Sequence, residues 1–178
     1  MKQLKETTMK KLILLLTIIC SLQMTMNAQS DYKSAIGVRI GGYYDLYAAS
    51  YKFFISDPGA IELNLGIKPF NTNLLLVKYN WTIFSLSGAY QHHFPIASVE
   101  GLQWYAGAGA TAYSSISNIE AYKGFGFVPF ITGGADYKFA KIPLNLSADF
   151  RPGINIGGID FYKSFYFTGG IAARYTLN

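Results

Sequence analysis

The final residues of the chain, 165–178, alternate between two kinds of side chain. One face carries mainly large apolar residues, and the other carries mainly small or polar ones. Because successive side chains of a β-strand point to opposite faces of a sheet, this pattern predicts a strand whose two faces meet different environments. The first face comprises Phe165, Phe167, Gly169, Ile171, Ala173, Tyr175 and Leu177, and the second comprises Tyr166, Thr168, Gly170, Ala172, Arg174 and Thr176.

The same alternation recurs along the chain and defines about eight segments of about ten residues, the length that a tilted membrane strand requires. No helical period competes over a comparable window. The segments lie at 36–41, 47–53, 61–68, 84–94, 102–111, 131–139, 142–151 and 165–177. The sequence therefore predicts an all-β chain, folded as an eight-stranded antiparallel up-and-down transmembrane β-barrel with a filled lumen.

The predicted connections alternate between short and long. The short ones are 56–59, 95–101 and 140–141, and the long ones are 69–80, 114–127 and 153–164. This asymmetry is typical of outer-membrane barrels, whose short turns face the periplasm. The connection at 42–45 is unexpectedly brief for its place among the long ones.

The first 28 residues predict a cleaved signal peptide. Four lysines precede a short apolar core at 12–20, and Met-Asn-Ala at 26–28 resembles a signal-peptidase site. The apolar core is too short to span a bilayer. Residues 29–178 are then expected to form a single outer-membrane β-barrel domain. They contain no apolar stretch near the ~20 residues of a membrane helix, so they can enter a membrane only as a closed sheet.

Removal of the predicted signal peptide, residues 1–28, changes the net charge and the cysteine content of the remaining chain. The chain has 15 Lys and Arg residues and 10 Asp and Glu residues. Residues 1–28 hold four lysines and one glutamate, so residues 29–178 keep 11 basic and 9 acidic residues. This near balance argues against nucleic acid as a partner. Cys20 is the only cysteine, so residues 29–178 can form neither an internal disulfide nor a thiolate metal site. We expect no cofactor and no metal.

A soluble barrel of the lipocalin type is the main structural alternative, because it also has about eight alternating strands but turns its apolar face inward. A water-facing exterior should be dense in Lys, Glu and Asp. The polar face of this chain instead carries many Gly, Ser and Ala residues, which suit a narrow lumen. The apolar face also predicts two aromatic belts at its two ends.

Several motifs resemble the small outer-membrane β-barrel proteins of the OmpA and OmpX type. They are the run 104–110 (Trp-Tyr-Ala-Gly-Ala-Gly-Ala), the segments 90–95 and 136–149, and the closing Arg-Tyr-Thr at 174–176. The resemblance covers residues 34–177 and implies a monomer in the outer membrane of a Gram-negative-type bacterium. It further implies contact with outer-membrane lipids and lipopolysaccharide, and with the barrel assembly machinery. It implies no common reaction. The chain departs from the family by ending in Leu177 and Asn178 rather than in an aromatic residue.

Eight charged residues fall on the predicted lumen face. They are Arg39, Lys52, Glu62, Asp136, Lys138, Asp149, Arg151 and Arg174. Because buried charges persist only when they are paired, we expect an ion network that plugs the barrel. Asp149 is expected to be the carboxylate that compensates Arg39, Arg151 and Arg174. The functional alternative is a path for protons or small ions, that is, a narrow channel.

No catalytic group stands out in the sequence. A lipid A or phospholipid-modifying enzyme, the other alternative, would need Ser and His near the outer rim. His92 and His93 instead lie near the short-turn rim and, as neighbours on a strand, point to opposite faces. A structural or surface-binding role without enzymatic activity is therefore favoured. Binding would use aromatic and apolar residues of the long connections. The candidates are Ile119, Tyr122, Phe125, Phe127, Phe161 and Tyr162. The alternative interpretation of this aromatic outer rim, which is slightly favoured, is an aromatic belt at the level of the lipid headgroups.

Overall fold

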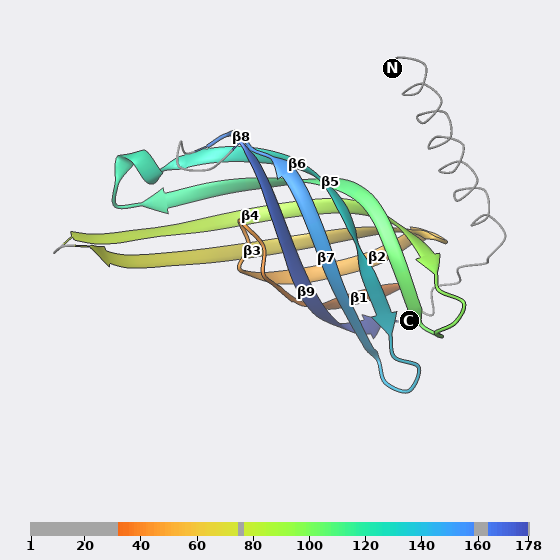
Figure 1. The fold of residues 1–178 in the computed structure, drawn as a ribbon. Coiled ribbons are helices and arrows are strands. Elements are labelled where there is room, and N and C mark those ends of the chain that lie inside the picture. The colour runs from red at the N-terminus through yellow and green to blue at the C-terminus, as the bar shows by residue number, and fades with distance from the viewer. Residues whose placement is uncertain (1–31, 75–76, 159–163, 178) are drawn as a thin grey trace, which may run out of the picture.

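The computed structural model of the protein describes residues 32–74, 77–158 and 164–177, and it consists almost entirely of antiparallel strands (Figure 1). The elements are β1 (Ser34–Ile40), β2 (Tyr47–Ser56), β3 (Gly59–Leu74), β4 (Val77–Pro95), β5 (Leu102–Ser117), η1 (Glu120–Tyr122), β6 (Gly124–Lys138), β7 (Leu144–Ile154), β8 (Ile156–Gly157) and β9 (Phe165–Leu177). No helix within the described residues is long and apolar enough to cross a membrane.

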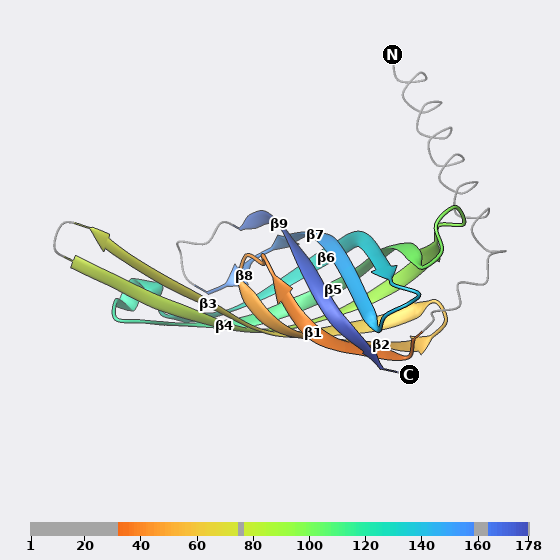
Figure 2. The same ribbon diagram turned by 90° about the horizontal axis from the view of Figure 1, so that it is seen from below.

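The sheet closes on itself. β1 pairs with β2 on one side and with β9 on the other, and β5 pairs with both β4 and β6. Every neighbouring pair is antiparallel, and β8 is a two-residue strand that continues beside β6 after β7 ends. Eight strands, β1 to β7 and β9, therefore form a closed barrel (Figure 2), and the predicted fold is confirmed.

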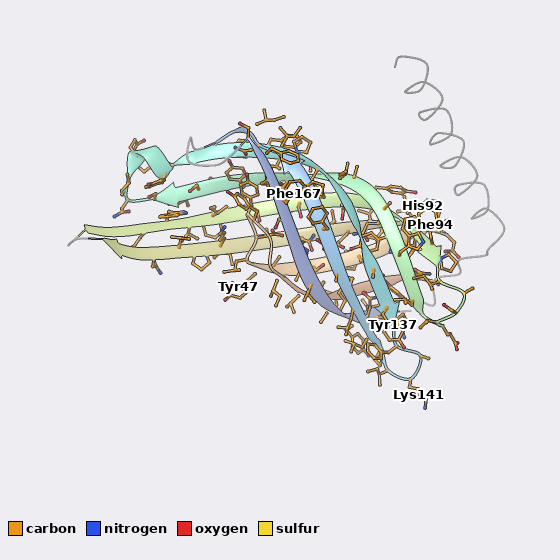
Figure 3. All side chains as sticks on the ribbon, viewed as in Figure 1. Tyr47, His92, Phe94, Tyr137, Lys141 and Phe167 are labelled. Atoms are coloured by element: carbon orange, nitrogen blue, oxygen red, sulfur yellow. The ribbon has the colours of Figure 1, made fainter. Side chains whose placement is uncertain are left out.

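The two faces of the barrel differ as the alternation predicts. Outward side chains are apolar and exposed: Leu65 is 66% exposed, Phe167 62% and Ile171 60%. Inward charged side chains such as Lys52 and Glu62 are 0% exposed. The lipocalin alternative, which requires the opposite arrangement, is therefore wrong. Figure 3 shows His92, Phe94, Tyr137 and Lys141 towards the end with the short turns, and Tyr47 and Phe167 towards the other end.

β3, β4, β5 and β6 continue past the rim of the barrel at the end opposite the short turns (Figure 1). The β3–β4 ladder runs to Leu74 and Val77, whereas β2 begins at Tyr47, opposite Ile67. The β5–β6 ladder runs to Ser115 and Gly124. The predicted long connections at 69–80 and 114–127 are thus mostly strand. The loop assignment was wrong because backbone pairing continues where the apolar alternation stops.

The brief connection between β1 and β2 folds into the barrel instead of away from it. Tyr44 is 2% exposed and Asp45 is 8% exposed. The turn begins at Gly41, whose φ of 107° disfavours residues with a side chain. Gly66 gives the turn room, because a Cβ atom there would lie 2.3 Å from the Cβ of Asp45. The connection therefore places Tyr44 and Asp45 inside the barrel.

Candidate functional site

Among the residues that the structure describes, eight buried charged side chains lie inside the barrel, and these form the lumen ion network. Its cations are Arg39, Lys52, Arg151 and Arg174, and its carboxylates are Asp45, Glu62, Asp136 and Asp149. All are at most 8% exposed, and they come from β1, β2, β3, β6, β7, β9 and the β1–β2 turn. Four positive and four negative groups make the network formally neutral.

Arg39 organises the part of the network nearest the β1–β2 turn. Its Nε and Nη2 donate to the two carboxylate oxygens of Asp149 at 3.1 and 2.6 Å, and its Nη1 donates to Asp45 at 3.0 Å. Two parallel bonds between a guanidinium and a carboxylate combine strength with fixed geometry. Gly170 provides the space, since a Cβ atom there would lie 2.4 Å from Nη2 of Arg39.

Glu62 organises the middle of the lumen. Its Oε1 accepts a hydrogen bond from Arg151 at 2.6 Å, and its Oε2 lies 2.9 Å from Nη2 of Arg174. The amides of Asn64 and Gln91 donate to the same carboxylate, each at 2.8 Å. Arg151 also contacts Asp149, with Nε 3.0 Å from Oδ1. The Glu62 carboxylate, although fully buried, is therefore compensated by two cations and two amides.

Asp136 organises the end nearest the short turns. It pairs with Lys52 and accepts a hydrogen bond from the amide of Asn145. His93 lies beside this pair, with Nε2 3.8 Å from Asp136 and 3.5 Å from the ammonium of Lys52. Asn145 also accepts a bond from Arg174 at 3.4 Å, which joins this group to the middle one. The network thus runs without interruption from Asp45 to Lys52.

The turn also contains ionisable groups that lie outside the strands. Burial raises the pKa of the Asp45 carboxyl, although the neighbouring Arg39 guanidinium lowers it in part. Burial likewise raises the pKa of the Tyr43 phenol. The carbonyl oxygen of Tyr43 accepts a hydrogen bond from Lys68 at 2.7 Å, and the Lys68 ammonium lies 4.9 Å from the Tyr43 ring centre.

The structure brings together seven of the eight predicted lumen residues. Lys138 is the exception: it lies at the short-turn end, where its ammonium donates to the carbonyl oxygens of Phe139 and Ile142 at 2.6 and 3.2 Å. The predicted pairing of Arg174 with Asp149 is wrong. The carboxylate beside Arg174 is Glu62, and Asp149 compensates Arg39 and Arg151. The strand register explains the difference, because Asp149 is opposite Gly170, whereas Arg174 is opposite Asn145.

Sequence reasoning missed Asp45 and the aromatic cluster beside it. The cluster comprises Tyr44, Trp81, Ile83, Tyr113, Val128 and Tyr166, with Tyr43 packed against it. Tyr44 stacks on Tyr113 at 4.3 Å between ring centres, and Tyr43 stacks on Tyr166 at 5.0 Å. The brevity of the 42–45 connection was the one available signal for an inward turn. The lumen therefore contains an apolar layer next to the ion network, at the end away from the short turns.

Four of the six residues predicted for surface binding, Ile119, Tyr122, Phe125 and Phe127, lie at the extended end of the barrel. Phe125 and Phe127 on β6 are 67% and 45% exposed. Tyr122 is half-buried and stacks on Trp81 at 5.0 Å, and Trp81 stacks in turn on Phe70 at 4.1 Å. Ile119 is also half-buried. Phe161 and Tyr162 lie outside the described residues.

The two histidines lie on opposite faces of β4. His93 is inside the lumen and 1% exposed, whereas His92 is outside and its Nδ1 lies 3.2 Å from the hydroxyl of Tyr90. Within residues 32–74, 77–158 and 164–177, no group of three or more His, Cys, Asp or Glu side chains could hold a metal ion.

A comparison with solved structures finds the crystal structure of Acinetobacter baumannii CarO2. It matches 80% of this chain and 98% of that chain, with a TM-score of 0.43 and 13% sequence identity. No family model matches the sequence, and no curated protein matches it. Because the structural match is distant, the eight-stranded fold rests on the strand pairings of this chain. The resemblance to the OmpA and OmpX type stays a prediction.

Proposed function

We propose that this chain is an outer-membrane β-barrel protein with a structural or surface-binding role and no enzymatic activity. The observation that carries the proposal is the distribution of polarity. A neutral network of eight charged groups fills the interior, while large apolar side chains such as Leu65 and Phe167 cover the exterior. Only a closed barrel satisfies every backbone polar group of a sheet within a bilayer, and lipid is the solvent that suits this exterior.

The filled lumen favours a structural or binding role over a channel. An ion that crossed the barrel would have to displace the Arg39–Asp149 and Glu62–Arg151 pairs, and then the stacked rings of Tyr44 and Tyr113. The ion pairs and the stacked rings lie one after the other along the lumen. A buried charge that loses its partner typically costs about 3 to 5 kcal/mol, so displacement of these pairs is unfavourable. We therefore expect no stable conductance.

The extended strands support surface binding. β3, β4, β5 and β6 continue beyond the barrel as a four-stranded sheet (Figure 1). This sheet has exposed aromatic residues such as Phe70 and Phe125. Binding energy in protein interfaces concentrates on aromatic residues. In the proposed orientation, this sheet faces the outside of the cell, where lipopolysaccharide and surface ligands are in reach. The barrel itself is expected to be a monomer inserted by the barrel assembly machinery.

Membrane fractionation tests the location. We expect the protein in the outer-membrane fraction, resistant to extraction by high pH, with a gel mobility that changes on boiling because the barrel unfolds only with heat. Recovery in the soluble periplasmic fraction would contradict the proposal. Mass spectrometry of lipid A with and without the protein tests the enzymatic alternative, and we expect identical spectra. A modified acyl or phosphate group that depends on the protein would favour an enzyme.

A further inference from the structure

The ladder between β6 and β7 is interrupted within the barrel wall. Pairing stops after Gly133, which lies opposite Phe150, and resumes only at Phe130. Ile131 and Thr132, which lie between these points, have no paired residue on β7. On its other side β6 pairs with β5 through both residues without a break. The interruption is therefore confined to one seam of the wall.

A proline explains the interruption. The N–H of Phe139 donates to the carbonyl oxygen of Leu144 at 3.0 Å, so these two residues are a hydrogen-bonded pair of the β6–β7 ladder. Hydrogen-bonded pairs of antiparallel strands recur every two residues, and the constant register makes Ile131 and Pro152 such a pair. Because proline has no N–H, Pro152 cannot donate to the carbonyl oxygen of Ile131.

The next pair along the seam has the same defect. It joins Pro129 to Ile154, so the carbonyl oxygen of Ile154 also lacks a donor from the neighbouring strand. Ile131 lies deeper in the wall, where it pairs with Ala108 on β5, and its side chain is 63% exposed on the outer face. Lipid offers no hydrogen bonds, so an unpaired carbonyl group at this depth is costly unless the protein or water satisfies it.

The lumen side of the seam carries buried polar atoms that also need partners. Within the part of the chain that the structure describes, the hydroxyl of Thr132, the hydroxyl of Tyr105 and Oε1 of Gln91 have no hydrogen-bond partner. The three residues are at most 4% exposed. The Tyr105 hydroxyl lies over β6, because a Cβ atom on Gly134 would be 2.7 Å from it. Gln91 lies on the same rung of the sheet as Thr132, two strands away. Buried polar atoms of native proteins are almost always hydrogen-bonded to protein or to water.

We propose that the β6–β7 seam binds internal water on its lumen side. A water molecule there donates to the carbonyl oxygen of Ile131, in place of the N–H that Pro152 lacks, and forms a second hydrogen bond with the hydroxyl of Thr132. Tyr105 and Gln91 supply further partners. An internal water typically makes about three hydrogen bonds to groups that otherwise have none, and this seam offers a carbonyl, two hydroxyls and an amide oxygen.

This inference rests on the proposed membrane location. With lipid on the outer face, the lumen is the side from which water can reach the seam. The polar filling of the lumen then has a second role beside charge pairing, because it completes the hydrogen bonding of the barrel wall where proline interrupts the ladder.

Nuclear magnetic resonance of the deuterated, ¹⁵N-labelled barrel in lipid nanodiscs tests the proposal. The readout is the nuclear Overhauser effect between long-lived water and backbone amides, which we expect at Thr132 and Gly133. Thr132→Val removes the hydroxyl at nearly constant shape and should reduce this signal severalfold, whereas Thr132→Ser should retain it. Thr111→Val is the matched control and should leave the signal unchanged. Thr111 is also buried in the lumen, but it is paired on both sides without a break.

Pro152→Ala tests the role of the proline independently. Its new N–H can donate to the carbonyl oxygen of Ile131 and displace the water. The water signal at Thr132 should then fall severalfold although the Thr132 hydroxyl is retained. The new amide should exchange with deuterium as slowly as the paired amides of the same ladder.

Two outcomes would overturn the proposal. The first is a folded wild-type barrel without a water signal at Thr132. The second is a signal that Pro152→Ala leaves unchanged, which would assign it to the Thr132 hydroxyl itself. If Thr132→Val does not fold, Pro152→Ala decides alone. Contacts between the methyl groups of Ile131 and lipid acyl chains are measured on a methyl-labelled sample, and their absence would contradict the membrane location instead of the water site.

Discussion

Arg39 on β1 and Asp149 on β7 are 110 residues apart in sequence, yet they form two parallel hydrogen bonds inside the barrel, at 3.1 and 2.6 Å. β9 lies between their two strands. The pair therefore spans the curvature of the barrel and links the N-terminal strand to the C-terminal part of the sheet. It forms only when β1 closes against β9, so it reports on barrel closure.

Removal of Asp149 is expected to destabilise the barrel strongly. Asp149→Ala leaves Arg39 and Arg151 short of a carboxylate, and uncompensated buried charge typically costs about 3 to 5 kcal/mol. Arg39→Met added to Asp149→Ala should recover part of this loss. The measurement is urea-induced unfolding in phospholipid vesicles, analysed as a double-mutant cycle.

Arg174→Met provides the matched comparison for that cycle. Arg174 contacts Glu62 and not Asp149, so its coupling to Asp149→Ala should be clearly smaller than that of Arg39. Equal coupling for Arg39 and Arg174 would show that the pairing described for the lumen is incorrect.

The alternating pattern predicted the strands, their faces and seven lumen charges, because period-two alternation follows directly from the geometry of a strand. It could not predict where β3 and β4 end, since pairing such as Phe70 with Trp81 continues where the apolar alternation has stopped. It also could not predict the pairing of Arg174 with Glu62, which depends on stagger between strands that are far apart in sequence. The β1–β2 turn points into the barrel because Tyr44 and Asp45 pack there. A turn of this kind has no periodic pattern in the sequence, so its direction could not be predicted.

An arginine on the proposed lipid face should destabilise the barrel. Ala108 is exposed on the outer face of β5, between its partners Tyr90 and Ile131. Ala108→Arg is expected to lower the free energy of unfolding by about 2 to 4 kcal/mol if it lies near the bilayer midplane. Ala108→Leu should have little effect or stabilise slightly. The assay is unfolding in vesicles, and an arginine as well tolerated as the leucine would argue against lipid contact at this face.

Truncation of Tyr44 should weaken the barrel without opening it. Tyr44 is almost fully buried and stacks on Tyr113, and removal of a buried aromatic ring typically costs about 3 to 5 kcal/mol. The ion network still fills the lumen in Tyr44→Ala, so conductance in planar bilayers should stay at background. Discrete single-channel steps in this variant, with folding intact, would favour the narrow channel over the plugged barrel.

The orientation of the barrel predicts which positions react from outside the cell. Lys123, between η1 and β6, is exposed at the extended end, and Asp57 is exposed in the short turn between β2 and β3. Cysteine at position 123 should react with an impermeant maleimide in intact cells, while cysteine at position 57 should react only after lysis. Labelling of position 57 alone in intact cells would reverse the orientation.

Fluorescence quenching by brominated lipids tests most directly which face of the barrel meets the membrane. The chain has two tryptophans: Trp104 lies on the outer face, 38% exposed, and Trp81 points inward and is 8% exposed. In vesicles of brominated phospholipid, Trp81→Phe, which retains Trp104, should be strongly quenched, and Trp104→Phe, which retains Trp81, should be nearly unaffected. Strong quenching of Trp81 with protection of Trp104 would contradict the central claim that the apolar exterior faces lipid around a filled, charged interior.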